Sequence, residues 1–291
     1  MKNLAHISKV ILLVFMANFT PKAQAVESFV FTAIPDQNEQ QLVERFGQVA
    51  NYLEKNLGVP VKYVPVKSYA AAVLAFRNNQ VQLAWFGGLS GVRARLLAPG
   101  SQAIAQGLED KEFVTYFIAH NSQSFPLADK LPETLKGKTF TFGSKGSTSG
   151  RLMPEFYLKE QLGQSPDKIF KRVGFSGDHS RTIALVQAGS FDVGAVNYKV
   201  WQSELAEGKI DLSKVHVFWK TPTYQDYQWS IRGDVDARFG EGFSEKVKQS
   251  LINLKDKKIL DAFPREKFIE AKNSDYQAIE KVAKSIGLLD E

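Results

Sequence analysis

The side chains best suited to chemistry are three consecutive hydroxyls, Ser147, Thr148 and Ser149, in a glycine-rich turn. The turn follows residues 139–142, whose β-branched and aromatic pattern predicts a strand, and precedes residues 151–158, which predict a helix. One hydroxyl is enough to cap a helix start. Because a helix N-terminus also presents free N–H donors and partial positive charge, three hydroxyls there predict a site for a phosphate-like or sulfate-like oxyanion. A flexible turn with more caps than it needs fits the same residues.

His179 is the titratable group best placed to join such a site. It follows Asp178 at the start of a helix predicted over residues 181–188. An imidazole there can donate to an oxyanion and could become cationic when the anion binds. Asp178 would orient this ring or cap the helix, and a surface histidine at a capped terminus is the alternative. His120 and His216 lie in connector-like or strand-like runs and are expected to be structural.

The first 25 residues predict a secretory signal instead of part of the fold. A short basic start precedes the apolar residues 10–16, which are too few to span a bilayer, and Ala23-Gln24-Ala25 matches a cleavage site. No later stretch is long and apolar enough to predict a membrane helix, so we expect no stable membrane insertion. The chain of 291 residues, 44% hydrophobic and 23% charged, is otherwise typical of a globular protein of two domains.

The sequence contains no cysteine. This excludes a disulfide framework, a thiol nucleophile and a cysteine metal site, and it removes the cysteine to which a lipid anchor would attach. With no H-E-x-x-H motif and no histidine cluster, we expect neither metal nor cofactor. Loss of Lys2, Lys9 and Lys22 with the signal lowers the formal charge from +6 to +3, which suits a small anionic ligand and argues against nucleic acid. The expected location is the periplasm.

Strand, turn and helix alternate along the chain, which predicts parallel α/β sheets with right-handed crossovers. A polar connector begins at His120, and a second connector covers residues 221–227. We therefore expect two lobes joined by a two-strand hinge, with ligand bound between them. The expected boundaries place residues 26–120 and 225–291 in lobe 1 and residues 121–224 in lobe 2.

Ligands of open α/β sheets bind beyond the carboxyl ends of the strands, where strands pass into helices. Three such junctions are expected in lobe 1 and two in lobe 2, so closure would bring them onto one anion. They are Pro35–Asn38, Ser68–Tyr69, Gly87–Ser90, Ser147–Gly150 and Asp178–Ser180. Tyr69, Trp85 and Tyr116 would wall the cleft and exclude water, although each also fits a core or surface position.

Five segments of the chain share a pattern with one protein family. They are Ser68–Val73, Leu83–Gly87, Gly146–Pro154, Gly177–His179 and Gly189–Ala195. In this order they resemble the phosphonate/phosphite family of ABC-transporter periplasmic substrate-binding proteins. The resemblance covers nearly the whole mature chain and implies a two-lobed fold of type II, with two mixed sheets flanked by helices. It also implies an ABC permease of the inner membrane as partner, and anion contacts from Tyr69, Tyr116, Ser147, Thr148, Ser149 and His179.

The chain departs from that family near Asn197, where the aminophosphonate binders carry an acidic residue. A carboxylate repels a fully deprotonated dianion, whereas an amide can donate to it. Asn197 is therefore expected at the ligand, and the change disfavours an aminoalkylphosphonate. Phosphite, a simple phosphonate, or a fully ionised anion such as sulfate or selenate remain, and a branch of the family resembles selenate-type binders. Arg151 would add charge to the site or face outward.

Two other functions fit parts of the pattern. A serine hydrolase would need G-x-S-x-G, but the turn places Thr148 at the nucleophile position, and no base with an orienting partner is evident. We therefore expect no catalytic residue. A sensory module that presents its anion to a membrane receptor needs the same closed form as a transport protein. The sequence leaves open which anion binds and which of these two partners receives it.

Overall fold

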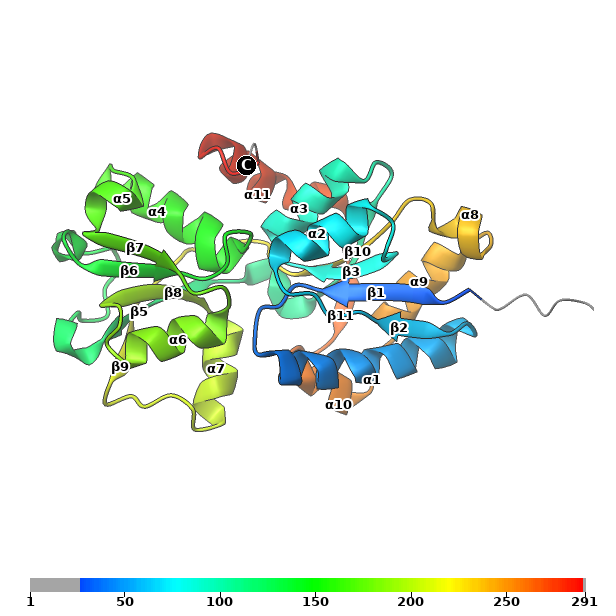
Figure 1. Cartoon of the computed structure of the whole chain (residues 1–291), viewed down its shortest axis with the longest axis horizontal. Helices are drawn as coiled ribbons and strands as arrows, with labels where there is room; N and C mark the ends of the chain where they lie inside the picture. The colour runs from blue at the N-terminus through cyan, green and yellow to red at the C-terminus, as the bar shows by residue number, and fades with distance from the viewer. Residues whose placement is uncertain (1–26, 290–291) are drawn as a thin grey trace, which may run out of the picture.

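Sheet pairing divides the computed structural model into two lobes (Figure 1). The structure describes residues 27–289, so the predicted signal segment 1–25 lies outside the described part. The first sheet has the strand order β11-β4-β10-β3-β1-β2 and the second β7-β6-β8-β5-β9. The strands are β1 (Phe29–Ala33), β2 (Val61–Tyr63), β3 (Leu83–Phe86), β4 (Gln102–Gly107), β5 (Thr115–His120), β6 (Thr139–Phe142), β7 (Arg172–Phe175), β8 (Val193–Asn197), β9 (Val215–Lys220), β10 (Gln228–Ile231) and β11 (Phe268–Glu270).

Helices cover both faces of each sheet. They are α1 (Glu39–Leu57), α2 (Tyr69–Arg77), α3 (Gly88–Leu97), α4 (Met153–Leu162), α5 (Pro166–Ile169), α6 (His179–Gln187), α7 (Tyr198–Ala206), α8 (Val235–Phe239), α9 (Phe243–Ile252), α10 (Lys257–Ala262) and α11 (Gln277–Ser285). Short helical turns are η1 (Leu108–Glu112), η2 (Asn121–Gln123), η3 (Glu133–Leu135), η4 (Thr148–Leu152) and η5 (Asn273–Tyr276). The expected two-lobed α/β fold with two mixed, helix-flanked sheets is confirmed.

In the first lobe a parallel unit, β2-β1-β3, meets antiparallel strands β10, β4 and β11. Helices α2 and α3 lie above this sheet and α1 and α10 below it in Figure 1. Alternating strand side chains send large aromatic rings into the core. Trp85, for example, lies 5.2 Å from Trp229 and 5.3 Å from Phe263 between ring centroids. These rings form a rigid base beneath the carboxyl ends of β1 and β3.

The second lobe contains β5, contrary to the boundary expected from the sequence. β5 pairs antiparallel with β8 and with β9, so residues 115–120 belong to the second sheet and not to lobe 1. The expected boundary after residue 120 is wrong by the length of this strand. The apolar pattern of Phe117–Ala119 predicts a buried strand equally well in either sheet, because pairing partners are far away in the sequence.

The chain crosses between the lobes twice, and the two crossings pair with each other. Phe113 and Tyr224 exchange backbone hydrogen bonds of 2.9 and 3.0 Å, and Thr221 N donates to Thr115 O at 3.1 Å. A two-strand hinge is the connection expected from the sequence, and its second strand lies in the expected connector 221–227, but its first strand lies at Phe113 and not at the polar connector that begins at His120. Beside it, Asp226 N donates to Asp110 O at 3.0 Å. The second crossing is therefore anchored to the first lobe just before β10.

A buried ion pair ties the C-terminal segment to this hinge. The Arg265 guanidinium donates to both carboxylate oxygens of Asp110, at 2.7 and 2.9 Å, and the two side chains are 3% and 0% exposed. Gly107 N donates to the same carboxylate at 2.9 Å. A bidentate arginine–carboxylate pair with a further N–H donor satisfies most of the buried polar groups.

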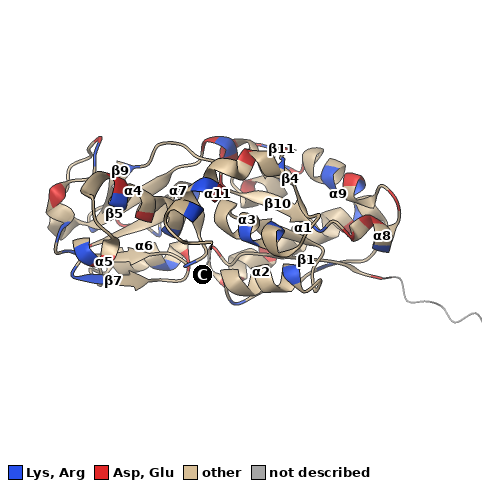
Figure 2. Ribbon diagram, turned by 90° about the horizontal axis from the view of Figure 1, so that it is seen from above, with Lys and Arg blue, Asp and Glu red and all other residues tan. Residues whose placement is uncertain are grey.

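Charged residues are interspersed over the rest of the molecule, with Lys and Arg close to Asp and Glu on both lobes (Figure 2). Interspersed charges of both signs fit a protein that binds a small ion better than one that binds a polyanion such as nucleic acid. Among residues 27–289, no helix is long and apolar enough to cross a membrane.

We expect Asp110→Ala to destabilise the protein by about 3–5 kcal/mol, because it leaves the Arg265 guanidinium buried without a counter-charge. The matched control is Lys67→Ala, which removes an ion pair to Glu39 whose side chains are 85% and 64% exposed. That change should alter the free energy of unfolding by about 1 kcal/mol or less. Urea unfolding measures both, and equal losses would contradict a structural role for the buried pair.

Candidate functional site

Helix starts from both lobes meet between the two sheets. Leu89 N, in the first turn of α3, donates to Thr148 Oγ1 of the other lobe at 3.0 Å. His179 N, the first residue of α6, donates across the cleft to Asp36 O at 3.0 Å. At the start of α2, Tyr69 approaches Gly146 so closely that a Cβ on that glycine would lie 3.0 Å from the tyrosine Cβ. The predicted convergence of junctions from the two lobes is confirmed.

The three hydroxyls have different roles. Ser147 is the cap, and its Oγ accepts from Gly150 N at 2.9 Å. Thr148 Oγ1 accepts from the other lobe, and Ser149 Oγ lies 3.4 Å from His179 Nε2. All three side chains are at most 2% exposed. Only Ser147 therefore serves as a cap, and the interpretation of the turn as a flexible, over-capped loop does not hold.

His179 is completely buried, and this burial lowers its pKa to about 3. Its Nδ1 accepts from Asn197 N at 3.3 Å, which places the ring proton on Nε2, the atom that faces Ser149. The imidazole is thus a neutral donor at physiological pH. The cationic form was considered from the sequence for the anion-bound state, and for that state it stays a prediction. Asp178 caps α6 by accepting from Arg181 N at 2.7 Å, and so it is the cap and not the partner of the ring.

Asp226 is a site residue that the sequence did not reveal. Its Oδ1 accepts from Gly88 N at 2.9 Å, at the start of α3, and its Oδ2 is buried without a hydrogen-bond partner among residues 27–289. Burial raises its pKa to about 7, against the opposing influence of Gly88 N–H and the Thr148 hydroxyl. The sequence feature that could have pointed to Asp226 is its position as an isolated acid in the second crossing, between the aromatic residues Tyr224 and Tyr227.

Two more of the expected residues reach the edge of the site. Tyr69 is 2% exposed, and hydrogen bonding to Ser147 partly offsets the rise in its pKa caused by burial. Asn197 is also 2% exposed, but both ends of its amide are occupied. Its Oδ1 accepts from Lys199 N at 2.7 Å, and its Nδ2 donates to Tyr227 Oη at 2.9 Å. Asn197 therefore borders the site with its donor already in use.

Trp85 and Tyr116 have no hydrogen bond or ring contact, among the described residues, with the side chains of Thr148, Ser149, His179 or Asp226. Trp85 lies in the core of the first lobe, stacked on Tyr227 with 5.4 Å between ring centroids. Tyr116 packs edge-on against Tyr198 at 5.9 Å. Because side chains alternate along a strand, its neighbour Thr115 takes the inward position instead, and donates to Ser149 O at 3.0 Å.

Arg151 adds no charge to the site. It forms an ion pair with Glu155, one helical turn further on, and its guanidinium carbon lies 4.8 Å from the centre of the Phe175 ring. This is the outward-facing alternative. The donors that the two lobes bring together, apart from the Asp226 carboxyl, are therefore uncharged hydroxyls, N–H groups and an imidazole.

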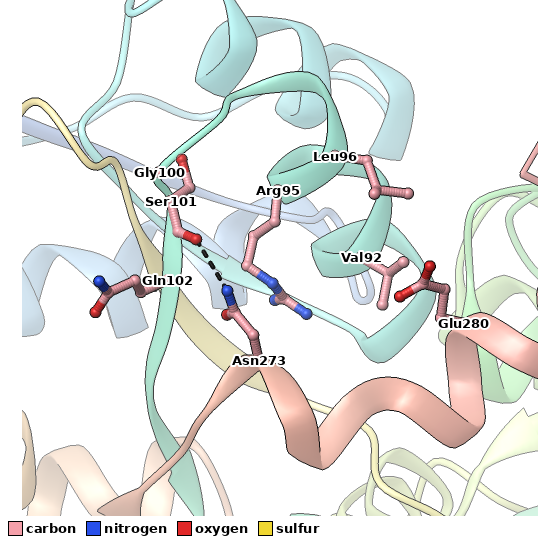
Figure 3. Close-up of a pocket in the computed structure, with 8 residues that line it drawn as sticks. All are labelled: Val92, Arg95, Leu96, Gly100, Ser101, Gln102, Asn273 and Glu280. Carbon is pink, nitrogen blue, oxygen red and sulfur yellow. Dashed lines mark hydrogen bonds between the residues drawn. The ribbon is translucent and has the colours of Figure 1, made fainter.

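A separate hollow of about 380 Å³ lies at the other end of α3 (Figure 3). Two of its polar side chains bond to the surrounding lobe, the first of them Asn273, whose Nδ2 donates to Ser101 O at 3.1 Å. Arg95 donates to Ser230 Oγ at 3.1 Å and lies 5.2 Å above the Tyr276 ring. The contacts around the hollow therefore hold η5 and α11 against the first lobe, away from the helix starts. Within the described part of the chain, no group of three or more acidic or histidine side chains is arranged to hold a metal ion.

A family model described as "ABC transporter, phosphonate, periplasmic substrate-binding protein" matches residues 31–276. The chain belongs to this family. It is 44% identical over 261 residues to the probable ABC transporter phosphite binding protein PhnD1 of Prochlorococcus marinus (strain MIT 9301), covering 87% of this chain and 88% of that relative. The resemblance inferred from the sequence is thereby confirmed.

Solved structures of phosphonate-binding proteins agree in fold. PhnD1 from Prochlorococcus marinus in complex with methylphosphonate is 42% identical, with a TM-score of 0.84 over 90% of this chain and 98% of the other. A binding protein component of an ABC phosphonate transporter from Pseudomonas aeruginosa is 21% identical, with a TM-score of 0.78 over 91% and 88%. The helix starts that meet between the lobes are therefore part of a fold that this chain shares with periplasmic phosphonate-binding proteins.

We expect Asp226→Asn to change how stability depends on pH. The wild-type carboxyl holds its proton up to a pKa of about 7 when folded but loses it near 3.8 when unfolded. Between pH 5 and 8 the folded state therefore binds more protons, and wild-type stability falls as pH rises. Asp226→Asn lacks this titrating group. Its free energy of unfolding should therefore rise by about 2–3 kcal/mol relative to that of wild type as the pH goes from 5 to 8. Urea unfolding of ligand-free protein at both pH values measures it; parallel pH dependence would contradict the raised pKa.

Proposed function

We propose that this protein captures a small tetrahedral oxyanion of the phosphite or phosphonate class between its lobes and delivers it to an ABC permease of the inner membrane. The observation that carries the proposal is the meeting of helix starts from two lobes around Thr148, Ser149, His179 and Asp226. Residues 1–25, outside the described part of the chain, would direct export to the periplasm.

The donor set favours an oxyanion over a cation or an apolar ligand. Helix N-termini carry partial positive charge and present N–H groups, and hydroxyls can turn their hydrogens toward an acceptor. His179 adds an Nε2–H whose direction is fixed by the bond from Asn197 N to Nδ1. Because the donors are neutral and buried, they can hold a charged ligand strongly without carrying a charge that must be desolvated.

Asp226 favours an anion that still carries a proton. When Asp226 is ionised, above its pKa of about 7, its unpartnered Oδ2 needs a donor, which a protonated ligand oxygen supplies. A fully ionised sulfate or selenate offers only acceptors, so ionised Asp226 would repel it. Asn197 led to the expectation that the site lacks a carboxylate and accepts a fully ionised anion. Asp226, in the second crossing, supplies a carboxylate, and this reverses that expectation. Phosphite and simple phosphonates therefore fit better than selenate.

The relatives support the same ligand class. The first relative is described as a probable phosphite binding protein, and the structure of PhnD1 contains methylphosphonate. The protein packs closely at Gly87, where an added Cβ would lie 3.1 Å from Asp226 Oδ1 and 3.2 Å from Thr148 Oγ1.

Binding without turnover agrees best with the geometry of His179. In a serine hydrolase the histidine Nδ1–H donates to an orienting carboxylate. Here Nδ1 accepts from a backbone N–H instead, and the low pKa makes the ring a poor base. The family context favours a transporter component over a catalyst or a sensor, although a sensory module would close on its anion in the same way.

Ser149→Ala should weaken binding of methylphosphonate and of phosphite by about 1.5–3 kcal/mol, or roughly tenfold to a hundredfold, because a hydroxyl bond to a charged ligand is lost. Isothermal titration calorimetry measures this. Ser250→Ala is the matched control, since Ser250 Oγ donates to Lys246 O within α9 of the first lobe, away from the helix starts. Equal affinity of the two variants would remove Ser149 from the binding site.

A melting-temperature series at pH 8 should distinguish the anions, since a ligand that binds the folded state raises the melting temperature by mass action. We expect methylphosphonate and phosphite to raise it, because either anion can bind with a proton that it shares with Asp226, and sulfate and selenate, which have no such proton, to leave it unchanged. Asp226→Asn should relax this discrimination. A larger rise with selenate than with phosphite would contradict the proposed ligand class.

A further inference from the structure

The start of α6 has a backbone donor that its own helix cannot satisfy. The first N–H groups of a helix have no intrahelical acceptor, and His179 occupies the first position after the cap. Its N–H is accepted at 3.0 Å by Asp36 O, which belongs to the other lobe. This bond therefore exists only while the lobes are closed, and it holds the residue whose imidazole faces the anion site.

The side chain of Asp36 makes a second link to the second lobe. Tyr227 Oη donates to Asp36 Oδ2 at 2.9 Å and accepts from Asn197 Nδ2 at 2.9 Å. The three side chains are at most 3% exposed. Asn197 N in turn donates to His179 Nδ1 at 3.3 Å. Asp36, Tyr227, Asn197 and His179 thus form a closed ring of contacts that passes from lobe 1 to lobe 2 and back.

We propose that Asp36 and Tyr227 are positioning residues of a cross-lobe latch, which holds His179 and Asn197 in the closed arrangement and sets anion affinity without touching the anion. The inference rests on the proposed function for its effect on affinity. The latch itself is defined by contacts between protein groups.

A small charged cavity behind the latch is consistent with this role. Asp36, Arg45, Asn197 and Tyr227 are among the residues that line it, and its volume is about 20 Å³, enough for one water molecule. Asp36 Oδ1 and Arg45 Nε are both buried without a hydrogen-bond partner among residues 27–289. One water in the cavity would donate to the carboxylate and accept from the guanidinium. The second lobe, through Asn197, closes the wall of this cavity.

The latch acts through the free energy of closure. Binding requires the closed form, so each protein bond made only on closure adds to the apparent affinity for any anion that the closed form accepts. A residue that contacts the ligand directly should instead affect different anions to different extents. The two roles can therefore be separated by comparing two ligands.

The test is Tyr227→Phe, which removes the shared hydroxyl and keeps the ring stacked on Trp85. Tyr52→Phe is the matched control, because Tyr52 Oη donates at 2.7 Å to Ser250 O within lobe 1. Calorimetry with methylphosphonate and with phosphite should show about a tenfold loss of affinity for Tyr227→Phe, equal for both anions, and no change for the control. No loss, or a loss for one anion only, would overturn the positioning role.

Amide hydrogen exchange tests the latch independently of the ligand. The His179 N–H has its acceptor in the other lobe, so NMR-detected exchange of that amide reports closure. In ligand-free protein we expect slower exchange in wild type and Tyr52→Phe than in Tyr227→Phe, and equal rates in all three would overturn the latch. If wild type binds neither anion, the proposed function fails while the exchange comparison still decides the latch.

Discussion

The structure depends on one constraint: the first N–H groups of a helix have no acceptor within that helix. In this protein, three of these donors find their acceptors outside their own helices. Leu89 N bonds to Thr148 of the second lobe, His179 N bonds to Asp36 of the first, and Gly88 N bonds to the hinge residue Asp226. Closure thus satisfies backbone groups that an open form would leave to water.

The fold brings these donors together through strand direction. In each lobe parallel strands deliver their helices at one edge of the sheet, β1 and β3 in the first and β6 and β8 in the second. The two edges face each other because the chain crosses twice and the crossings pair at Phe113 and Tyr224. The Asp110–Arg265 ion pair then fixes the second crossing, and with it Asp226, relative to the core of the first lobe.

Burial determines the chemistry of the site. It keeps His179 neutral, with a pKa of about 3, and it raises the pKa of Asp226 to about 7. The first effect yields a fixed donor, and the second yields a carboxyl whose preference depends on whether the ligand carries a proton. Arg151 adds no counter-charge to the cleft, because it turns toward Glu155 and the Phe175 ring instead. The candidate site therefore combines neutral donors with one acid.

The sequence alone was sufficient for the local features. The β-branched runs, the strand-to-helix junctions Ser68–Tyr69 and Asp178–Ser180, and the hydroxyl turn predicted the elements, the two lobes and the family, because these depend on neighbouring residues. Tertiary structure decided the rest. It placed β5 in the second sheet, turned Thr115 inward instead of Tyr116, and kept Trp85 in the core. It also occupied the Asn197 amide with Tyr227 and supplied Asp226 from the hinge. These outcomes depend on which distant segments pair and how deeply each group is buried, and neither is determined by residue type or spacing along the chain.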